Sequence, residues 1–303
     1  MKKFKHIWIF SDSILGHEIQ SQAIASKLTN HVETFHCTLR QPWLSFAPRI
    51  LPRFGRNIIW ENKFPNPKQA PDVIITCGRR MAAIGKYFKQ QLHCTHIQIL
   101  NPGDNTNHYD ILICPEHDRI TGRNIVTSQG SIHNICKESL STIKCEVKPK
   151  KTVSIILGNP AKGFFNNLKQ LAIQINQYFP KYDLMICASR RTAKKYHSTI
   201  RGIFSHAHTL WLDSSDGENP YRNLLACSNV LMVTADSINM VSEACASDKC
   251  VIAIAQNNIS PKHKRFIESI NKRLSSMDNL KEKNIPLKTL DKVSQEVVRL
   301  LSI

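Results

Sequence analysis

The chain has 303 residues, long enough for two domains of ordinary size, and 42% of them are hydrophobic, which excludes wholesale disorder. The formal net charge is +18 and is spread evenly over both halves, so no single basic tail explains it. Such a charge favours an anionic partner, whether nucleic acid, an acidic membrane surface or phosphorylated small molecules.

The cysteines and the apolar runs bear on the location of the protein. The ten cysteines are scattered, and none forms a C-x-x-C pair. The first residues do not read as a signal peptide, so we expect a reducing cytoplasm and no disulfides. No apolar run approaches the roughly 20 residues that a membrane-spanning helix needs. Any membrane role is therefore expected as peripheral attachment at the inner face.

In chain order, residues 1–148 alternate between predicted strands and helices. Apolar runs predict strands at 6–11, 32–37, 72–77, 95–100 and 110–114. Helical periodicity predicts helices at 17–29 and 79–91. Alternation of this kind is typical of a parallel sheet built from βαβ units.

Residues 149–303 repeat the alternation. Strands are predicted at 152–157, 182–187, 209–212, 230–233 and 250–255, and helices at 164–178, 192–200, 220–226, 237–246, 261–274 and 287–303. The sequence therefore predicts an α/β protein with two Rossmann-like domains, 1–148 and 149–303. The last helix is a candidate to pack back onto the N-terminal domain. Ligands bind at the carboxyl ends of strands in such folds, so the two domains are expected to face each other across a cleft.

Residues 40–68 interrupt the alternation. The segment is rich in proline, basic and aromatic residues and carries a single acid, Glu61. The prolines exclude one long helix. Aromatic residues interleaved with arginine favour contact with an anionic membrane surface or a stacked ligand. The alternative is an irregular loop that folds its aromatic side chains back onto the domain.

A polar turn at residues 11–16 joins the first strand to the first helix. Gly16 allows the backbone to turn sharply, and His17 follows it at the helix start. An imidazole at the carboxyl edge of a sheet can take a proton from an acceptor hydroxyl, which makes His17 the candidate catalytic base. The alternative is a solvated histidine beside a turn that Asp12 or Ser13 shapes. The turn lacks the G-x-G-x-x-G pattern of a dinucleotide site.

Two further strand-end turns of the first half carry charge. Arg79 and Arg80 follow the third strand at a helix start, where the helix dipole disfavours cations unless an anion lies between them. They are candidate contacts to a phosphate or carboxylate of the acceptor. Glu116 and His117 follow a later strand and are candidates for acid–base work or acceptor contact. No metal site is expected there, because adjacent residues point in different directions.

The second half has corresponding turns. Gly158 allows a diphosphate to approach the backbone. Ser189 and Arg190 follow the second strand, and the arginine fork suits phosphate oxygens. The alternative there is a helix cap with solvated arginines. Asn219 precedes Pro220 at a helix start, where it is both an expected N-cap and a candidate nucleotide contact.

The turn at residues 234–237 follows an apolar run and opens a helix. Thr234 and Ser237 place small polar side chains at a helix N-terminus, whose unpaired N–H groups and partial positive charge favour a phosphate. Glu243 lies about two turns into the helix, where its carboxylate can reach a ribose. These residues point to a nucleotide-bearing ligand.

Taken in chain order, these turns resemble those of the family named for the plant mitochondrial fission protein ELM1, over nearly the whole chain. The resemblance implies a GT-B-like fold, as in nucleotide-sugar glycosyltransferases, and does not by itself imply an activity. The turn before Glu243 is also similar to the donor-binding segment of GT-B enzymes such as the transferase that makes the second lipid-linked peptidoglycan precursor. The chain departs from the family pattern at residues 13 and 14, at 159 and at 248–250, where glycine, arginine or proline is usual.

The leading prediction is a metal-independent GT-B-type glycosyltransferase that moves a sugar from a nucleotide-sugar donor to a hydroxyl of a lipid or envelope glycan. No cofactor is expected besides the donor substrate, because arginines and a helix dipole can stabilise the leaving diphosphate. The alternatives are a non-catalytic ELM1-like scaffold or partner-binding protein, and a basic nucleic-acid-binding protein. The even charge and the lack of a recognised nucleic-acid motif argue against a specific nucleic-acid partner.

Overall fold

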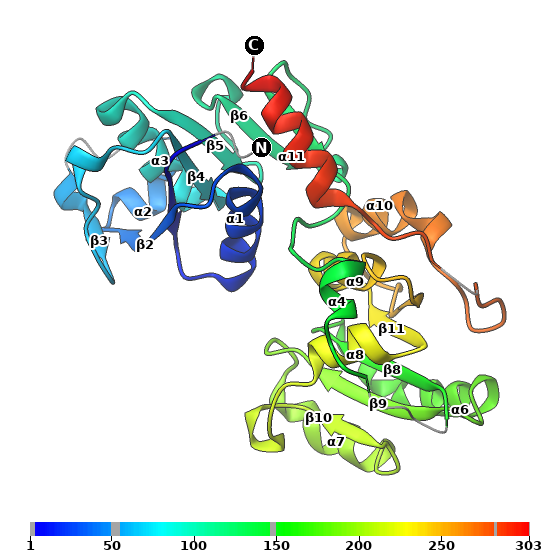
Figure 1. Cartoon of the computed structure of the whole chain (residues 1–303). Coiled ribbons are helices and arrows are strands. Elements are labelled where there is room, and N and C mark those ends of the chain that lie inside the picture. The colour runs from blue at the N-terminus through cyan, green and yellow to red at the C-terminus, as the bar shows by residue number, and fades with distance from the viewer. Residues whose placement is uncertain (1–3, 50–54, 146–149, 282–283, 303) are drawn as a thin grey trace. The chain divides into compact units, whose positions relative to one another are not determined.

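The computed structural model describes residues 4–49, 55–145, 150–281 and 284–302 (Figure 1). The chain divides into two compact units. Unit 1 comprises Met1–Asn134 together with Thr289–Ile303, and unit 2 comprises Ile135–Lys288. Each unit is built on its own mainly parallel sheet, so the predicted pair of Rossmann-like α/β domains is confirmed.

In the described part of unit 1, seven strands form one sheet in the order β3-β2-β1-β4-β5-β6-β7. Their bounds are β1 Ile7–Ser11, β2 Val32–Leu39, β3 Ile58–Trp60, β4 Val73–Cys77, β5 Thr95–Ile99, β6 Ile111–Pro115 and β7 Ile125–Ser128. The edge strand β3 runs antiparallel to β2, whereas the other neighbours are parallel. The chain reverses its direction of winding between β1 and β4, which are adjacent in the sheet.

Side-chain alternation along β1 gives the sheet of unit 1 two apolar faces. Ile7 and Ile9 belong to a core with α1 (Leu15–Leu28) and α11 (Thr289–Leu300), and these two helices pack side by side (Figure 1). Trp8 and Phe10 belong to a second core, under α3 (Gly78–Leu92) and α2 (Trp43–Phe46). Single 3-10 turns lie at Gly55–Asn57, Pro67–Gln69, Thr106–His108 and Glu116–Asp118.

Among the described residues of unit 2, five parallel strands follow the order β10-β9-β8-β11-β12. Their bounds are β8 Thr152–Leu157, β9 Asp183–Ala188, β10 Thr209–Trp211, β11 Val230–Thr234 and β12 Cys250–Ile254. The helices are α4 Lys137–Ser141, α5 Lys162–Asn166, α6 Leu168–Tyr178, α7 His197–Ile203, α8 Tyr221–Cys227, α9 Ile238–Cys245 and α10 Pro261–Ser269. Single 3-10 turns lie at Lys194–Tyr196, Ser214–Asp216 and Asn271–Arg273. Winding reverses here between β8 and β11.

The predicted boundary at 148/149 lies outside the described residues, and the division between the units falls earlier in the chain. It falls between Asn134 and Ile135, because α4 packs its Leu140 into the core beneath α9 and β11. The C-terminal helix α11 belongs to unit 1, where Val293 and Val297 are buried against α1 and β7.

Several predicted elements need correction. Strands β3 and β7 were not predicted, because runs of three and four residues at a sheet edge are too short to show a period. The predicted helix 164–178 is interrupted at Asn167, and the helix 261–274 ends at Ser269. The segment predicted as a helix from 192 first makes a turn and a 3-10 element, and α7 begins at His197.

The cysteines also depart from expectation. Cys145 and Cys227 form a disulfide across 82 residues of sequence, which joins the segment after α4 to the end of α8. The prediction of no disulfides is therefore wrong for this pair. Such a distant pair carries no local spacing signal, so only the fold brings the two sulfurs together. Within the described ranges, every helix is too short or too polar to cross a bilayer.

Candidate functional site

The two reversals of winding define where each sheet can hold a ligand. In a doubly wound sheet the crevice opens at the carboxyl ends of the strands on either side of the reversal. In unit 1 these are the ends of β1 and β4, and in unit 2 they are the ends of β8 and β11. Four of the predicted turns follow these four strands.

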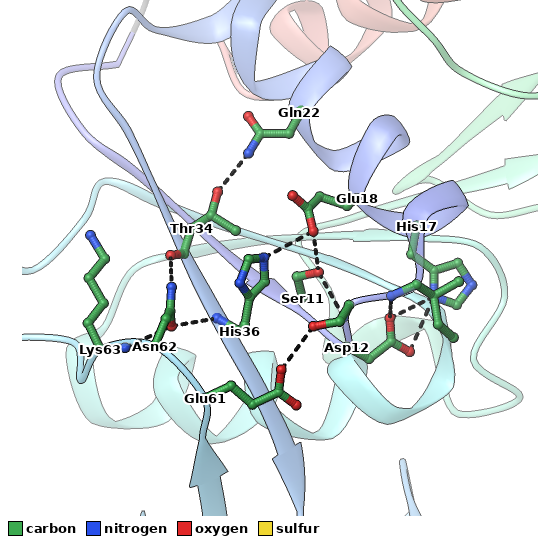
Figure 2. Close-up of polar contacts among 12 residues, drawn as sticks. Ser11, Asp12, His17, Glu18, Gln22, Thr34, His36, Glu61, Asn62 and Lys63 are labelled. Atoms are coloured by element: carbon green, nitrogen blue, oxygen red, sulfur yellow. Dashed lines mark hydrogen bonds and ion pairs between the residues drawn. The ribbon is translucent and has the colours of Figure 1, made fainter. Parts of the chain in front are cut away.

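At the end of β1, His17 is held by Asp12 (Figure 2). Nδ1 of the imidazole lies 3.1 Å from Oδ1 and 3.3 Å from Oδ2 of the carboxylate. The side chain of Asp12 is 6% exposed and that of His17 is 25% exposed, so the carboxylate is covered while the ring reaches solvent. A carboxylate only accepts hydrogen bonds, so it keeps the proton on Nδ1 and leaves Nε2 as the acceptor. This is the arrangement of a base and its orienting group.

The turn after β4 lies directly against this histidine. Gly78 has a φ of +79°, and a β-carbon at this position would lie only 2.7 Å from Cε1 of His17. Only glycine fits both the backbone conformation and the ring. The structure therefore brings together two turns that lie far apart in the sequence, that of His17 and that of Gly78-Arg79-Arg80.

A second polar network fixes the start of the same turn (Figure 2). Oε2 of Glu18 lies 3.0 Å from Oγ of Ser11 and 3.0 Å from Nε2 of His36. Oγ of Ser13, whose φ is +58°, donates to Glu61 over 3.0 Å. The sequence did not identify Glu18, His36 or Glu61 as partners of this turn. The parallel register, which pairs Ser11 with His36, was the missing information.

Arg79 lines a cavity of about 440 Å³ at the same edge of the sheet. The walls combine apolar side chains with the two guanidinium groups of Arg49 and Arg79, and the lining residues are Ser45, Phe46, Ala47, Pro48, Arg49, Arg79, Pro102 and Gly103. This volume is in the range of small-molecule sites. Arg80 is exposed on α3. The predicted acceptor side of the protein thus includes part of the 40–68 segment.

The remaining pair of the first half lies elsewhere. Glu116 and His117 form a 3-10 turn after β6, and β5 separates β6 from β4 in the sheet. The side chain of His117 is 3% exposed, with Nε2 lying 3.7 Å from Oδ1 of Asp118. A buried imidazole is closed to an acceptor, which leaves Glu116 as the exposed member of the predicted pair.

In unit 2 the turns after β8 and β11 contact each other. The N–H of Gly158 donates to Oγ1 of Thr234 over 2.7 Å, and that of Asn159 donates to Oδ2 of Asp236 over 2.8 Å. A β-carbon at 158 would lie 2.5 Å from Oδ2 of Asp236. The room that glycine leaves, predicted for a diphosphate, is thus taken by a carboxylate. Within the described residues, Oδ1 of Asp236 is buried without a hydrogen-bond partner.

The turn after β9 is pinned to the end of β8. Oγ1 of Thr192 lies 2.5 Å from the carbonyl oxygen of Gly158, and the N–H of Ser189 donates to Oγ1 of Thr192 over 3.1 Å. Oγ of Ser189 accepts from the N–H of Arg191 over 3.2 Å. Ser189 therefore shapes a turn and caps no helix, while Arg190 and Arg191 are exposed beside it.

The motifs around Asn219 and Glu243 also meet. Oδ1 of Asn219 accepts from the N–H of Tyr221 over 2.9 Å, and Oη of Tyr221 donates to Oε2 of Glu243. Burial raises the pKa of Glu243, against the opposing effects of Tyr221 and of the charge of Arg222. The carboxylate is thus held in a fixed place with its second oxygen uncommitted to Tyr221. The sequence did not single out Tyr221 as the partner.

Ser237 is the N-cap of α9, and its Oγ accepts from the N–H of Met240 over 3.4 Å. The N–H of Met240, one of the groups at this helix end that lack a partner within the helix, is therefore hydrogen-bonded to the cap. With Asp236 next to it, the N-terminus of α9 carries a negative charge of its own.

These folds and strand-end turns define a protein with the GT-B-like architecture. Among solved structures, MurG of Acinetobacter baumannii matches with a TM-score of 0.53 and 10% identity over 98% of this chain and 99% of its own. The glycotransferase of kitacinnamycin matches with a TM-score of 0.53 and 12% identity over 99% and 91%. At such identities the likeness concerns the fold.

The chain belongs to the mitochondrial fission ELM1 family, whose model matches residues 15–301. It is 29% identical to the Rickettsia prowazekii (strain Madrid E) protein named Uncharacterized protein RP120, over 88% of each chain. It is 24% identical to Mitochondrial fission protein ELM1 of Arabidopsis thaliana, over 68% of this chain and 56% of that protein. The resemblance predicted from the strand-end turns is confirmed.

Proposed function

We propose that the protein is a glycosyltransferase that moves a sugar from a nucleotide-sugar donor to a hydroxyl of a lipid or envelope glycan. The observation that carries the proposal is the pair of Asp12 and His17 at the winding reversal of unit 1. Sugar transfer to a hydroxyl needs a base for its proton, and Nε2 of His17 is the free acceptor of this pair. Asp12 acts as its positioning residue.

The acceptor is assigned to unit 1. The cavity lined by Arg79 combines apolar walls with two guanidinium groups, which suits an acceptor carrying an anionic group beside an apolar chain. Its position after β4 and β5 is at the carboxyl edge that also holds His17. We assign Arg79 and Arg80 to the anionic group of the acceptor.

The donor is assigned to unit 2. The exposed Arg190 and the capped end of α9 at Ser237 are the proposed contacts to the diphosphate. Glu243, which Tyr221 holds in place, is the proposed ligand of the ribose. A glycotransferase among the structural neighbours of the same fold supports sugar transfer as the proposed reaction.

The test combines a thermal-shift screen with a turnover assay. The purified chain is screened against UDP, GDP, CMP and their sugars, and the best donor is followed by release of its nucleotide. We expect His17→Ala to keep donor stabilisation and to lower turnover by about 10²–10⁴-fold, the usual contribution of a general base. Asp12→Asn is expected to lower turnover less and to keep donor stabilisation. Failure of every nucleotide to stabilise the wild-type chain would overturn the proposal.

The described residues of the segment 40–68, which include α2 and β3, are the proposed contact with an anionic membrane surface. Trp43 and Trp60 pack against the core, as the alternative prediction had it, but Phe46 is 53% and Phe64 76% exposed. Binding to vesicles containing phosphatidylglycerol, and none to vesicles of phosphatidylcholine alone, is the expected result. Phe64→Ser should weaken that binding, whereas Ile173→Ser should not, because Ile173 is an apolar residue of unit 2 that is also exposed, at 59%.

One observation favours a second candidate, a non-catalytic protein that binds a partner. The carboxylate of Asp236 fills the space over Gly158 and adjoins the N-terminus of α9, where a diphosphate was predicted. A fixed negative charge there opposes an anion. This candidate predicts no nucleotide stabilisation of the wild-type chain. Asp236→Asn removes the charge and keeps an acceptor for the N–H of Asn159. The variant distinguishes the two candidate functions, because only a nucleotide-sugar donor site should gain nucleotide affinity when this charge is removed.

A further inference from the structure

A cluster of potential metal ligands lies at the opposite end of the first sheet from His17. It consists of His6, His31 and Glu33, at the amino ends of β1 and β2. The parallel register pairs Ile7 with Val32 and therefore sets His6 beside His31. The two imidazole rings stack with their centroids 4.3 Å apart and an interplanar angle of 16°.

Strand geometry adds the third ligand. Residues two apart on a strand point to the same face, so Glu33 lies on the same side of β2 as His31. Oε1 of Glu33 is 3.0 Å from Nε2 of His6, and all three ligand atoms lie within 4.8 Å of one another. Nε2 of His6 is buried and makes no well-aligned hydrogen bond within the described residues. The backbone therefore holds three donor groups around one point.

The donor set has a definite chemical preference. Two imidazoles and one carboxylate are the protein ligands of Zn²⁺ sites that keep an open fourth position, at metal–ligand distances of about 2.0–2.2 Å. Ligand atoms at such distances from one ion lie closer together than 4.8 Å, so the three side chains must move toward one another when they bind it. His31 is exposed, so an ion can enter from solvent.

The side chain of Lys63 forms an ion pair with the carboxylate of Glu33. Nζ of Lys63 lies 2.6 Å from Oε2 of Glu33 and stands over the ring of Phe35, 4.9 Å from its centroid. The pairing with Lys63 lowers the pKa of Glu33 and keeps the carboxylate ionised. A metal ion must compete with Lys63 for Glu33. Removal of Lys63 is therefore expected to strengthen metal binding, whereas removal of a ligand weakens it.

We propose that His6, His31 and Glu33 bind a divalent transition metal of the Zn²⁺ type. The ion joins the amino ends of β1 and β2 and is distinct from the sugar-transfer site at their carboxyl ends. Because it binds the folded sheet, it stabilises unit 1. The proposal is independent of the glycosyltransferase assignment.

The test uses the full chain without a polyhistidine tag. Zn²⁺ binding is measured by calorimetric titration, and Co²⁺ is used as a spectroscopic probe. We expect one equivalent of metal and a Co²⁺ spectrum without the thiolate charge-transfer band that cysteine ligands would produce. His31→Ala should weaken binding by about 10–100-fold or more, since even the loss of an outer-shell partner costs that much. His36→Ala, on the same strand but on the α1 side, is the matched control and should bind as wild type does.

Lys63→Gln provides the second arm. Removal of the competing ammonium should tighten Zn²⁺ binding, whereas a site elsewhere on the chain would not respond. Absence of stoichiometric binding by the wild type overturns the proposal. Equal affinity of the His31→Ala and wild-type chains also overturns it. A thiolate band with Co²⁺ overturns it as well, because the metal would then be bound by a cysteine such as Cys94 or Cys136.

Discussion

At the scale of single residues, the turns after β1 and β4 approach each other closely because Gly78 has no β-carbon. Gly78 serves twice, because its φ of +79° disfavours any β-carbon and the ring of His17 fills the space where one would be. The histidine is thereby held from two sides, by a carboxylate at Nδ1 and by a backbone at Cε1. Such double support is what a base needs to keep its geometry.

Gly78→Ala is expected to destabilise unit 1 and to displace His17. The cost combines backbone strain of about 1 kcal/mol with the overpacking of a methyl group against the ring, typically about 1–3 kcal/mol. Gly103→Ala is the matched control, because Gly103 has a φ of +75° but nothing within 4 Å of its would-be β-carbon. Urea unfolding of both variants measures the difference. Equal losses of stability would show that the ring does not resist the methyl group.

Glu243 gives a prediction about pH. Burial raises its pKa in the folded state, so the folded protein keeps this proton to a higher pH than the unfolded chain does. The stability contribution of the group is complete below the unfolded pKa and is lost as the pH rises through the folded pKa. Glu243→Gln cannot ionise and keeps an acceptor for Tyr221. We expect the variant to gain stability relative to wild type in urea titrations as the pH rises above the ordinary glutamate pKa of about 4.3. A relative loss over that range would mean that a cation holds the carboxylate ionised.

At the scale of elements, the strand-end turns owe their positions to the winding of each sheet. The turns after β1 and β4 meet because these strands are neighbours in the sheet, although α1, β2, α2 and β3 lie between them in the sequence. The turns after β8 and β11 meet for the same reason. Glu116 and His117 stay apart from this edge pair because β5 lies between β6 and β4.

The disulfide ties two elements of unit 2. Cys145 follows α4 and Cys227 ends α8, whose packing also involves the core beneath α9. Cys227→Ser, measured under oxidising conditions, is expected to lower the unfolding free energy by about 2–4 kcal/mol, the typical effect of closing a long loop. Cys136→Ser is the control, because Cys136 is a free cysteine at the start of α4, the helix that Cys145 follows. A reducing agent should erase the difference between Cys227→Ser and wild type. If it does not, the loss comes from packing.

At the scale of the whole molecule, each unit has its own cores and its own sheet, so the chain is expected to unfold in two calorimetric transitions. α11 reaches unit 1 from the far end of the chain and completes the core against α1.

Val297→Ala is expected to lower the midpoint of one transition only. Val297 is fully buried in the core of unit 1, and its truncation costs roughly 1–3 kcal/mol through lost burial and a residual cavity. Val298→Ala, at the next and partly buried position of α11, is the milder control. Differential scanning calorimetry measures both, and the same transition should respond to Gly78→Ala. A common shift of both transitions by Val297→Ala would contradict the expectation of two separate transitions.

The sequence by itself determined the class of architecture and the location of the candidate site along the chain. Alternation of apolar runs with helical periodicity predicted ten strands within a residue or two of their bounds, because buried parallel strands are short and continuously apolar. It also placed His17 and Gly158 shortly after strand ends and Glu243 in the helix that follows β11, as the structure has them. Their proposed functions stay predictions.

Only the tertiary structure decided which side chains meet. Asp12 with His17, Tyr221 with Glu243 and Asp236 with Gly158 depend on turn conformation and on strand order, which local periodicity does not contain. The disulfide and the triad of His6, His31 and Glu33 depend on distant pairing and on strand register. A sequence pattern shows which residues are buried and at what spacing. Contacts between separate segments depend on the order and register of the strands in each sheet.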